Sequence, residues 1–492
     1  MRQCMTILVI LLLYGCSGKN NQGPSGVIGD LSSYLGGVAA DEARASLVGQ
    51  DILSAGGTSA DAAVAMGFAL MVSRPDSAGP GGGGVCVHYN SAKNQADSLE
   101  FLPRNPNKQT PRGYRTTMIP GSFRGLYALH AHYGKLRWEQ LVKPAEKAAR
   151  FGWPVSKGLN SALNDRGHFA HKENNTRKLF TNFKNQFLSI GEIIKQFELA
   201  ATLSIIRRQG PGYFYSGPLG RAFIKGVKET GGWLSHESLR MYRPSWSKTV
   251  KAESGHNILH FPLVKGLGTK FTYEIWNQLG NRRGFVSLSE SNKAAIFISA
   301  ARKSGFLNIK RTGERGGSVG LIAMDVSGNA TSCVLTMNRP FGLGYMAGST
   351  GIIEAAPSAE NNHLNIAPVV MANKSLSESY LAATAAGDRY AGIALASTLI
   401  RLLNGSKYLE EVLLKPRYIP GDKENKIIVE KTLPKEELET LIQKGLDPSH
   451  ALRSIGQVNM VYCKMGIVTG PSSCVVRTDP RTAAYGVNSE HK

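Results

Sequence analysis

A serine that follows two glycines is the feature of this sequence that most suggests chemistry. Gly316-Gly317-Ser318 stands directly before an apolar run, Val319 to Val326. Glycine lets the backbone adopt the strained geometry in which a side-chain oxygen attacks the preceding carbonyl. Cleavage there would give Ser318 an α-amine beside its own hydroxyl, so one residue would hold both nucleophile and base. The other interpretation is a tight turn into a core strand, because short motifs are weak evidence of catalysis.

A β-hairpin must position this serine. The run Val319 to Val326 is followed by the turn Ser327-Gly328-Asn329 and a second apolar run, Val334 to Met337. Because Gly and Asn tolerate positive φ, this pattern predicts two paired, half-buried strands.

A second turn with small residues offers a place to hold negative charge. Predicted strands at 368–371 and 379–384 lead to Ala385-Ala386-Gly387-Asp388-Arg389, which opens a predicted helix at 390–403. Backbone N–H groups at a helix N-terminus point outward and suit an oxyanion. An ordinary strand-to-helix turn remains the alternative.

The N-terminal third predicts helices around a glycine run. Residues 41–55 form an amphipathic pattern, and Ser59, with Asp61 in the first turn, is expected to cap the apolar helix 60–72. Gly81 to Gly84 follow, and they either cradle an anion or allow close backbone packing. Further helices are expected after Pro120-Gly121, near Trp138 and from Pro144. Residues 160–230 are basic, polar and helical in tendency.

Several of these segments resemble the γ-glutamyltranspeptidase family, whose members are N-terminal-nucleophile hydrolases. The resemblance covers most of residues 37–160 and 316–405 and the C-terminal end. It is carried by Asp61-Ala62-Ala63 with the glycine run, by Gly328-Asn329-Ala330, and by Asn338 with Phe341-Gly342. It implies an α/β (α+β) fold of the four-layer αββα sandwich type.

The resemblance also implies roles for individual residues. Ser318 stands where the family has its catalytic threonine, which self-cleavage between Gly317 and Ser318 would expose. Thr336 matches the threonine that supports the nucleophile by a hydrogen bond, and Asn338 matches an asparagine that contacts the glutamyl group. Ala386-Gly387 takes the place of the Gly-Gly pair that forms the oxyanion hole.

Other positions depart from the family pattern. Glu360 falls near the acidic residue for the substrate α-amine, and Leu364-Asn365 replaces the serine pair for the α-carboxylate, so Asn365 is the remaining candidate donor. Leu102 occupies the place of the arginine that binds this carboxylate. Arg104 can replace that arginine only if the loop shifts by two residues. A leucine cannot supply an arginine's bidentate grip on a carboxylate.

The first residues predict export and a lipid anchor. Residues 1–16 have an apolar core too short to span a bilayer, and they end in Leu13-Tyr14-Gly15-Cys16, which resembles a bacterial lipobox. We therefore expect a signal peptide at 1–16, a lipidated Cys16 and a flexible tether at 17–30. The catalytic domain would follow as a large part, 31–317, and a small part, 318–492. The expected location is the cell envelope, on the periplasmic or outer face of a bacterial membrane.

Composition limits the partners. The 492 residues are 42% hydrophobic, and 58 Lys+Arg against 36 Asp+Glu give a net charge of +22. The basic residues are scattered, so nucleic-acid binding is not expected. The net charge gives weak electrostatic support for contact with an anionic membrane or polyanionic surface. Cys463 and Cys474 bracket a predicted hairpin and can pair, while Cys86 and Cys333 are expected to be buried free thiols. No cysteine has metal-ligand spacing, and neither a metal nor an organic cofactor is implied.

These observations predict an acyltransferase or hydrolase similar to γ-glutamyltranspeptidase. Ser318 would cleave γ-glutamyl amides such as glutathione through an acyl-enzyme, and the two fragments would stay together as a heterodimer. The alternative is a catalytically degenerate member of the family that acts as an envelope binding or scaffold lipoprotein.

Overall fold

Ser318 begins a strand of a seven-stranded antiparallel sheet. The computed structural model describes residues 35–488, apart from 107–108, 264–265, 283, 286, 309–316, 358–364, 406–407, 452–454 and 483. The sheet has the order β20-β1-β11-β12-β2-β3-β8. Its strands are β1 (Gly36–Ala40), β2 (Gly83–Asn90), β3 (Gln95–Glu100), β8 (Ser245–Lys248), β11 (Ser318–Asp325), β12 (Ala330–Thr336) and β20 (Tyr485–Asn488).

A six-stranded antiparallel sheet packs on one face of the first. Its order is β19-β18-β14-β13-β10-β9, and β11 and β12 both contact β14. The strands are β9 (Val250–Ser254), β10 (Asn257–Phe261), β13 (Ala367–Asn373), β14 (Glu378–Ala386), β18 (Gln457–Cys463) and β19 (Cys474–Arg477).

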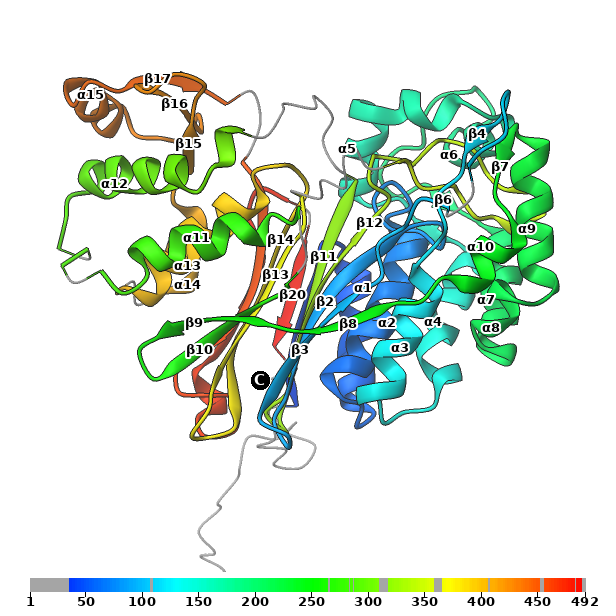
Figure 1. The fold of residues 1–492 in the computed structure, drawn as a ribbon, viewed down its shortest axis with the longest axis horizontal. Helices are drawn as coiled ribbons and strands as arrows, with labels where there is room; N and C mark the ends of the chain where they lie inside the picture. The colour runs from blue at the N-terminus through cyan, green and yellow to red at the C-terminus, as the bar shows by residue number, and fades with distance from the viewer. Residues whose placement is uncertain are drawn as a thin grey trace, which may run out of the picture. The chain divides into compact units, whose positions relative to one another are not determined.

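Helices cover the outer face of each sheet, which gives four layers (Figure 1). Those on the side of the seven-stranded sheet are α1 (Ala43–Ser54), α2 (Ser59–Ser73), α3 (Ser122–Tyr133), α4 (Trp138–Phe151), α5 (Lys157–Arg166), α6 (Asn174–Phe180), α7 (Phe197–Gln209), α8 (Gly212–Tyr215), α9 (Pro218–Glu229) and α10 (His236–Met241). Those on the other side are α11 (Thr269–Leu279), α12 (Glu290–Lys303), α13 (Ala391–Leu403), α14 (Leu409–Leu414) and α15 (Lys435–Gln443).

Small sheets complete the described elements. β4 (Arg115–Thr116) pairs with β7 (Gly232–Trp233), and β5 (Trp153–Pro154) pairs with β6 (Ile193–Ile194). The third small sheet contains β15 (Tyr418–Pro420), β16 (Lys426–Val429) and β17 (Asp447–His450).

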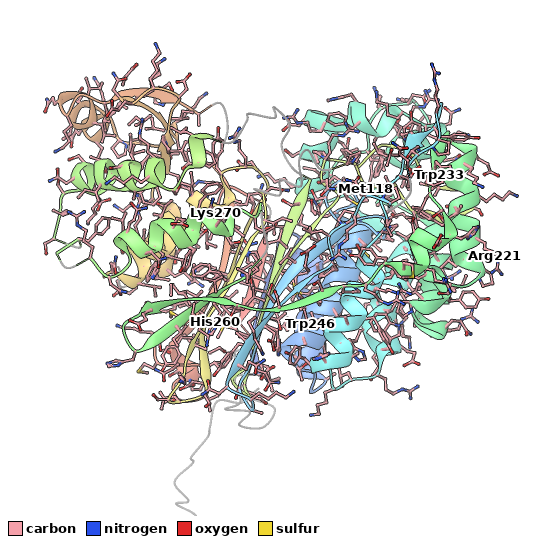
Figure 2. The ribbon with its side chains drawn as sticks, in the orientation of Figure 1. Met118, Arg221, Trp233, Trp246, His260 and Lys270 are labelled. Carbon is pink, nitrogen blue, oxygen red and sulfur yellow. A yellow bond between two sulfur atoms is a disulfide. The ribbon has the colours of Figure 1, made fainter. Side chains whose placement is uncertain are left out.

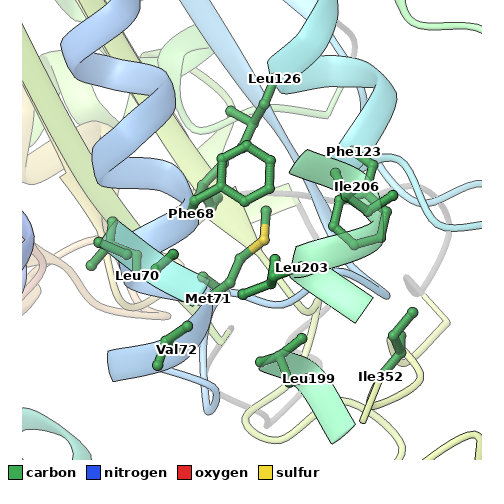
Figure 3. Close-up of a cluster of buried hydrophobic side chains, with 14 of the residues drawn as sticks. Phe68, Leu70, Met71, Val72, Phe123, Leu126, Leu199, Leu203, Ile206 and Ile352 are labelled. Atoms are coloured by element: carbon green, nitrogen blue, oxygen red, sulfur yellow. The ribbon is translucent and has the colours of Figure 1, made fainter. Parts of the chain in front are cut away.

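Helix α2 is the centre of the larger core. All of its residues are buried, as its apolar sequence predicts. Figure 3 shows Phe68 and Met71 of α2 among side chains of α3 and α7. The expected cap is wrong by one residue: Thr58, rather than Ser59, is the N-cap, and it forms a capping box with Asp61.

A second correction concerns Pro144. The sequence predicts a helix that starts at Pro144, but this proline lies inside α4, which begins at Trp138. The amphipathic face of α4 packs on α2 and α7, and this tertiary contact outweighs the local preference of proline for a helix start.

The predicted hairpin is confirmed, and its register decides where Ser318 faces. β11 and β12 are antiparallel, with Ser318 opposite Thr336. Side chains alternate between the faces of a strand. Val319 and Leu321 belong to the core with α2, whereas a side chain at Gly320 would meet Thr384 of β14. Ser318 shares the face of Gly320 and therefore points toward the six-stranded sheet.

The chain crosses from one sheet to the other between β8 and β9. Figure 2 labels Trp246 on β8 and His260 on β10, which lie on either side of this crossing. Thr249, at the crossing itself, hydrogen-bonds His260 Nδ1 at 2.9 Å. This connection therefore joins an edge strand of the first sheet to an edge strand of the second.

The glycine run packs against neighbouring backbone. A Cβ at Gly81 would lie 2.1 Å from the Ile353 carbonyl oxygen, and a Cβ at Gly83 would lie 2.1 Å from that of Phe101. At Gly82 and Gly84 a Cβ would lie 2.3 and 2.6 Å from carbonyl oxygens of β12. Of the two interpretations of this run, the structure supports close packing of the backbone rather than an anion cradle.

Both cysteine pairs form disulfides across neighbouring strands. Cys463 of β18 bonds Cys474 of β19, as the hairpin between them allows. The expectation of free thiols at Cys86 and Cys333 is wrong, because β2 and β12 are paired with these two residues directly opposite each other. Strand pairing between residues far apart in the sequence is not visible in local patterns.

A buried ion-pair network holds the C-terminal segment. Arg417 contacts Asp479 at 2.7 Å, and Arg481 contacts Glu430 at 2.6 Å and Asp479 at 3.2 Å. Burial by itself disfavours the Asp479 carboxylate, but Arg417 and Arg481 outweigh it and lower the pKa of Asp479. The network thus stabilises the folded chain in its charged form.

This network predicts a stability loss in acid. A carboxyl whose folded pKa is depressed contributes stability above its unfolded pKa, about 4, and loses it as the pH falls through the folded pKa. We expect wild type to exceed Asp479→Asn in urea midpoint at pH 7, and the difference to shrink below about pH 4. Asp422→Asn, at an exposed carboxyl, is the control. A wild-type advantage that stays constant down to pH 3 would contradict this role.

Residues 35–489 form one compact unit. The predicted signal peptide, the lipidated Cys16 and the tether lie outside the described residues. Within the described part of the chain, every helix is too short or too polar to cross a membrane.

Candidate active site

The Ser318 hydroxyl is fixed between two backbone groups. Ser318 is only 2% exposed. Its Oγ donates to the Asn365 carbonyl at 3.0 Å and accepts from the Gly387 N–H, also at 3.0 Å. A hydroxyl with a donor aimed at it and an acceptor for its proton is oriented for attack rather than free to rotate.

The carbonyl just before Ser318 is also polarised. The Gly317 carbonyl oxygen accepts from Thr336 Oγ1 at 2.7 Å and from the Met337 N–H at 3.0 Å. The Asn338 N–H donates to Thr336 Oγ1 at 2.8 Å and so directs the threonine proton at this carbonyl. Two donors on one carbonyl oxygen are the arrangement that stabilises an oxyanion.

Only glycine fits at position 317. A Cβ there would lie 2.7 Å from the Arg339 carbonyl group and 2.8 Å from the Asp76 carbonyl oxygen. The predicted cleavage pair, Gly317 and Ser318, therefore lies at a close approach of three backbone segments.

The predicted oxyanion turn lies directly beside Ser318. β14 ends at Ala386 and α13 begins at Ala391, with Gly387 between them at φ +94°. Ala386 is buried and is not among the described residues with positive φ, so its methyl group causes no backbone strain. Gly387, whose positive φ requires glycine, is a glycine in this chain. Ala386, which replaces the first glycine of the family pair, causes no backbone strain.

Two buried side-chain amides have atoms without a partner in the described part of the chain. Asn338, at φ +63°, donates its Nδ2 to the Ala356 carbonyl at 2.7 Å, but its buried Oδ1 accepts no hydrogen bond. The buried Nδ2 of Asn365 donates none. Buried polar atoms are usually paired, so these two are candidates for contact with a ligand.

The structure does not bring Arg104 to the nucleophile. Its guanidinium contacts Glu100 at 3.3 Å and the Arg243 carbonyl at 3.1 Å. Leu102, at the family's arginine position, is buried in an apolar cluster with Ile366 and Ala386. The loop shift that would aim Arg104 at Ser318 is therefore not present. Glu360 lies outside the described residues.

A cavity of about 120 Å³ opens beside Ser318. Its lining brings together three segments that the sequence patterns did not associate with the site: the end of α2, helix α5 and the start of β18. The lining residues are Arg74, Asp76, Ser77, Gly158, Ser161, Ala162, Asp165, Arg166, Ser318, Pro340, Gly387 and Gln457. The only sequence signal for α5 was the basic, helical tendency of residues 160–230.

Two of these charged groups neutralise each other. Arg74 makes a bidentate contact with Asp76, at 2.8 and 2.9 Å, and donates to the Asp41 carbonyl at 3.2 Å. Burial by itself disfavours the charge, but Asp76, Asp41 and Glu42 together raise the pKa of Arg74 above its ordinary value. Arg74 is therefore a charged structural residue at the wall of the cavity.

Comparison with known proteins finds similarity to one family. Residues 45–280 match the family model described as Gamma-glutamyltranspeptidase. The chain is similar to this family over a little under half of its length. Glutathione hydrolase 3 of Arabidopsis thaliana is 27% identical to it over 385 residues, which cover 67% of this chain and 60% of that relative. The match thus spans less than two thirds of the relative's length.

Solved structures show likeness to the same family and to a related fold. A γ-glutamyltranspeptidase from Helicobacter pylori superposes with a TM-score of 0.50 at 28% identity, over 54% of this chain and 80% of that one. Cephalosporin acylase from Bacillus halodurans reaches a TM-score of 0.78 at 19% identity, over 94% of this chain and 97% of its own. The latter likeness concerns the fold, and it confirms the predicted four-layer αββα sandwich.

Proposed function

We propose that this protein is an amide hydrolase or acyltransferase of the γ-glutamyltranspeptidase family that cleaves its own chain before Ser318. Two sets of hydrogen bonds around the Gly317–Ser318 peptide bond carry the proposal. The Ser318 hydroxyl is held at 3.0 Å from Gly387 N and from Asn365 O. The Gly317 carbonyl oxygen receives two hydrogen bonds, from Thr336 and Met337.

Self-cleavage would use both arrangements. Ser318 Oγ attacks the Gly317 carbonyl carbon, and the oxyanion that forms is stabilised by Thr336 Oγ1 and the Met337 N–H. The Gly317–Ser318 C–N bond breaks, the proton from Oγ passes to the released amine, and an ester joins Gly317 to Ser318 Oγ. Water then hydrolyses this ester and leaves a carboxylate on Gly317 and an α-amine on Ser318.

The processed site would act on an external amide. The Ser318 α-amine takes the Oγ proton, and Oγ attacks the substrate carbonyl while the Gly387 N–H stabilises the oxyanion. The substrate amine leaves, and an acyl group remains on Ser318. Water or an acceptor amine then releases it. Similarity to the family supports a γ-glutamyl amide such as glutathione as the substrate.

Both fragments would stay together after cleavage. The seven-stranded sheet contains strands from both fragments hydrogen-bonded to each other: β11 pairs with β1, and β12 pairs with β2. Cys86 precedes the cleavage point and Cys333 follows it, so their disulfide also links the fragments covalently. A heterodimer is therefore the expected processed form.

The predicted lipobox at Cys16 supports placing this heterodimer in the bacterial envelope, anchored by lipid. The alternative, a scaffold lipoprotein without activity, draws its support from Leu102, which occupies the family's arginine position as part of an apolar cluster.

Intact mass and N-terminal sequencing of the purified protein test this proposal. After reduction, wild type is expected to give two fragments, the smaller comprising residues 318–492, whereas Ser318→Ala is expected to give one chain. Without reduction, wild type is expected to remain one covalent species, heavier than the uncut chain by one water. Ser318→Thr, which restores the family residue, is the positive control. An uncut wild-type chain would favour the scaffold alternative.

A further inference from the structure

The cavity beside Ser318 contains an arginine with a buried N–H group that has no hydrogen-bond partner in the described part of the chain. Arg74 and Asp76 cancel through their bidentate contact. Asp165 is also engaged with another group. The remaining charged residue of the lining is Arg166, the last residue of α5. In the part of the chain that the structure describes, its buried Nε has no hydrogen-bond partner.

An arginine whose buried Nε has no acceptor is a candidate binding group for an anion. A buried N–H group without an acceptor has lost its hydrogen bond to water without a replacement, and the loss is larger when the group is charged. A carboxylate satisfies a guanidinium with two parallel hydrogen bonds, which is the strongest arrangement that either group makes. Because Arg166 shares its cavity with Ser318 and Gly387, such an anion would lie on the molecule that Ser318 attacks.

The position where this family has its carboxylate-binding arginine is not usable here. Leu102 there packs against Ile366 and Ala386, and Arg104 is engaged by Glu100. We infer that Arg166, at the end of α5, binds a carboxylate on the acyl group of the substrate, with Ser161 and Gln457 as the neighbouring polar side chains. This inference rests on the proposed function.

The size and charge of the cavity define the substrate class. Its volume of about 120 Å³ is below the roughly 300 Å³ at which sites for drug-sized ligands begin. It suits a short acyl chain that ends in a carboxylate. Both γ-glutamyl and glutaryl amides have this carboxylate, and they differ in the α-amine. The carboxylates of the described lining, Asp76 and Asp165, are already engaged, so neither is an uncommitted partner for the amine.

Kinetics on three p-nitroanilides test the inference. The γ-glutamyl and glutaryl compounds carry the carboxylate, and the butyryl compound lacks it. Arg166→Met is expected to lower kcat/KM roughly 10- to 100-fold for the two carboxylate substrates, mainly through KM, because a charged hydrogen-bond partner is lost. It should leave butyryl hydrolysis unchanged. Arg166→Lys should recover part of the loss as a point charge. A kcat/KM for the glutaryl compound similar to that for the γ-glutamyl compound would mean that the enzyme does not recognise the α-amine.

Arg221→Met, at an exposed arginine of α9, is the matched control and should behave as wild type (Figure 2). The extent of self-cleavage in each variant shows whether folding is intact. Equal kinetics for wild type and Arg166→Met on the carboxylate substrates would overturn the inference. A loss of kcat/KM on the carboxylate substrates in Arg104→Met, and not in Arg166→Met, would also overturn the inference.

Calorimetry with glutarate separates this inference from the proposed function. Wild type is expected to bind glutarate more tightly than butyrate, and Arg166→Met is expected to lose this preference. If wild type cleaves none of the three amides but shows Arg166-dependent glutarate binding, the proposed function fails and the carboxylate site stands. If wild type is active and glutarate binding does not depend on Arg166, the site fails and the proposed function stands.

Discussion

Replacing Thr336 by valine is expected to slow cleavage before Ser318 by about 10²- to 10³-fold, the usual effect of removing one oxyanion donor. Thr336 Oγ1 lies 2.7 Å from the Gly317 carbonyl oxygen, and valine keeps the shape of the side chain while it removes this donor. The Met337 N–H would remain, so cleavage should be slowed rather than abolished. The measurement is intact mass of reduced, timed samples of each variant.

Thr336→Ser is the matched control, because it keeps the hydroxyl and loses only a methyl group. It should cleave at nearly the wild-type rate. If Thr336→Val also cleaves at the wild-type rate, the hydrogen bond from Thr336 to Gly317 does not activate that carbonyl. The Met337 N–H would then be the donor that stabilises the oxyanion.

Gly387→Ala is expected to lower kcat for amide hydrolysis by a comparable factor, about 10²-fold or more. At φ +94° a side chain is strained, and a Cβ would lie 2.9 Å from Gln457 Cδ. Relief of this strain must turn the peptide whose N–H lies 3.0 Å from Ser318 Oγ. The oxyanion donor would then be misplaced, whereas KM should change less than kcat.

Ala386→Gly restores the glycine pair of the family one residue earlier and serves as the control. Since Ala386 has no positive φ, this exchange should change kcat little. Both variants are assayed after complete self-cleavage, confirmed by mass, so that only the acyl-transfer step is compared. Full activity in Gly387→Ala would show that another group supplies the oxyanion donor.

The sequence by itself determined the elements around the nucleophile. The hairpin at 319–337, the apolar helix α2 and the turn at 385–389 were predictable because each is encoded locally, in the period of the apolar residues and in the glycines of the turns. The resemblance to the γ-glutamyltranspeptidase family placed Ser318, Thr336 and Gly387, and the structure brings these three residues into one site.

Tertiary structure alone decided which other residues reach that site. Glycines 81–84 can cradle an anion or pack closely, and only the carbonyl oxygens that surround them decide for packing. Cys86 and Cys333 are 247 residues apart, and strand pairing joins them. Arg166 lies on a helix whose local pattern is unremarkable, yet packing places it in the cavity of Ser318, while Arg104 faces Glu100. Local sequence fixes the period and ends of an element, but the direction of a side chain toward a distant group depends on the packing of the whole chain.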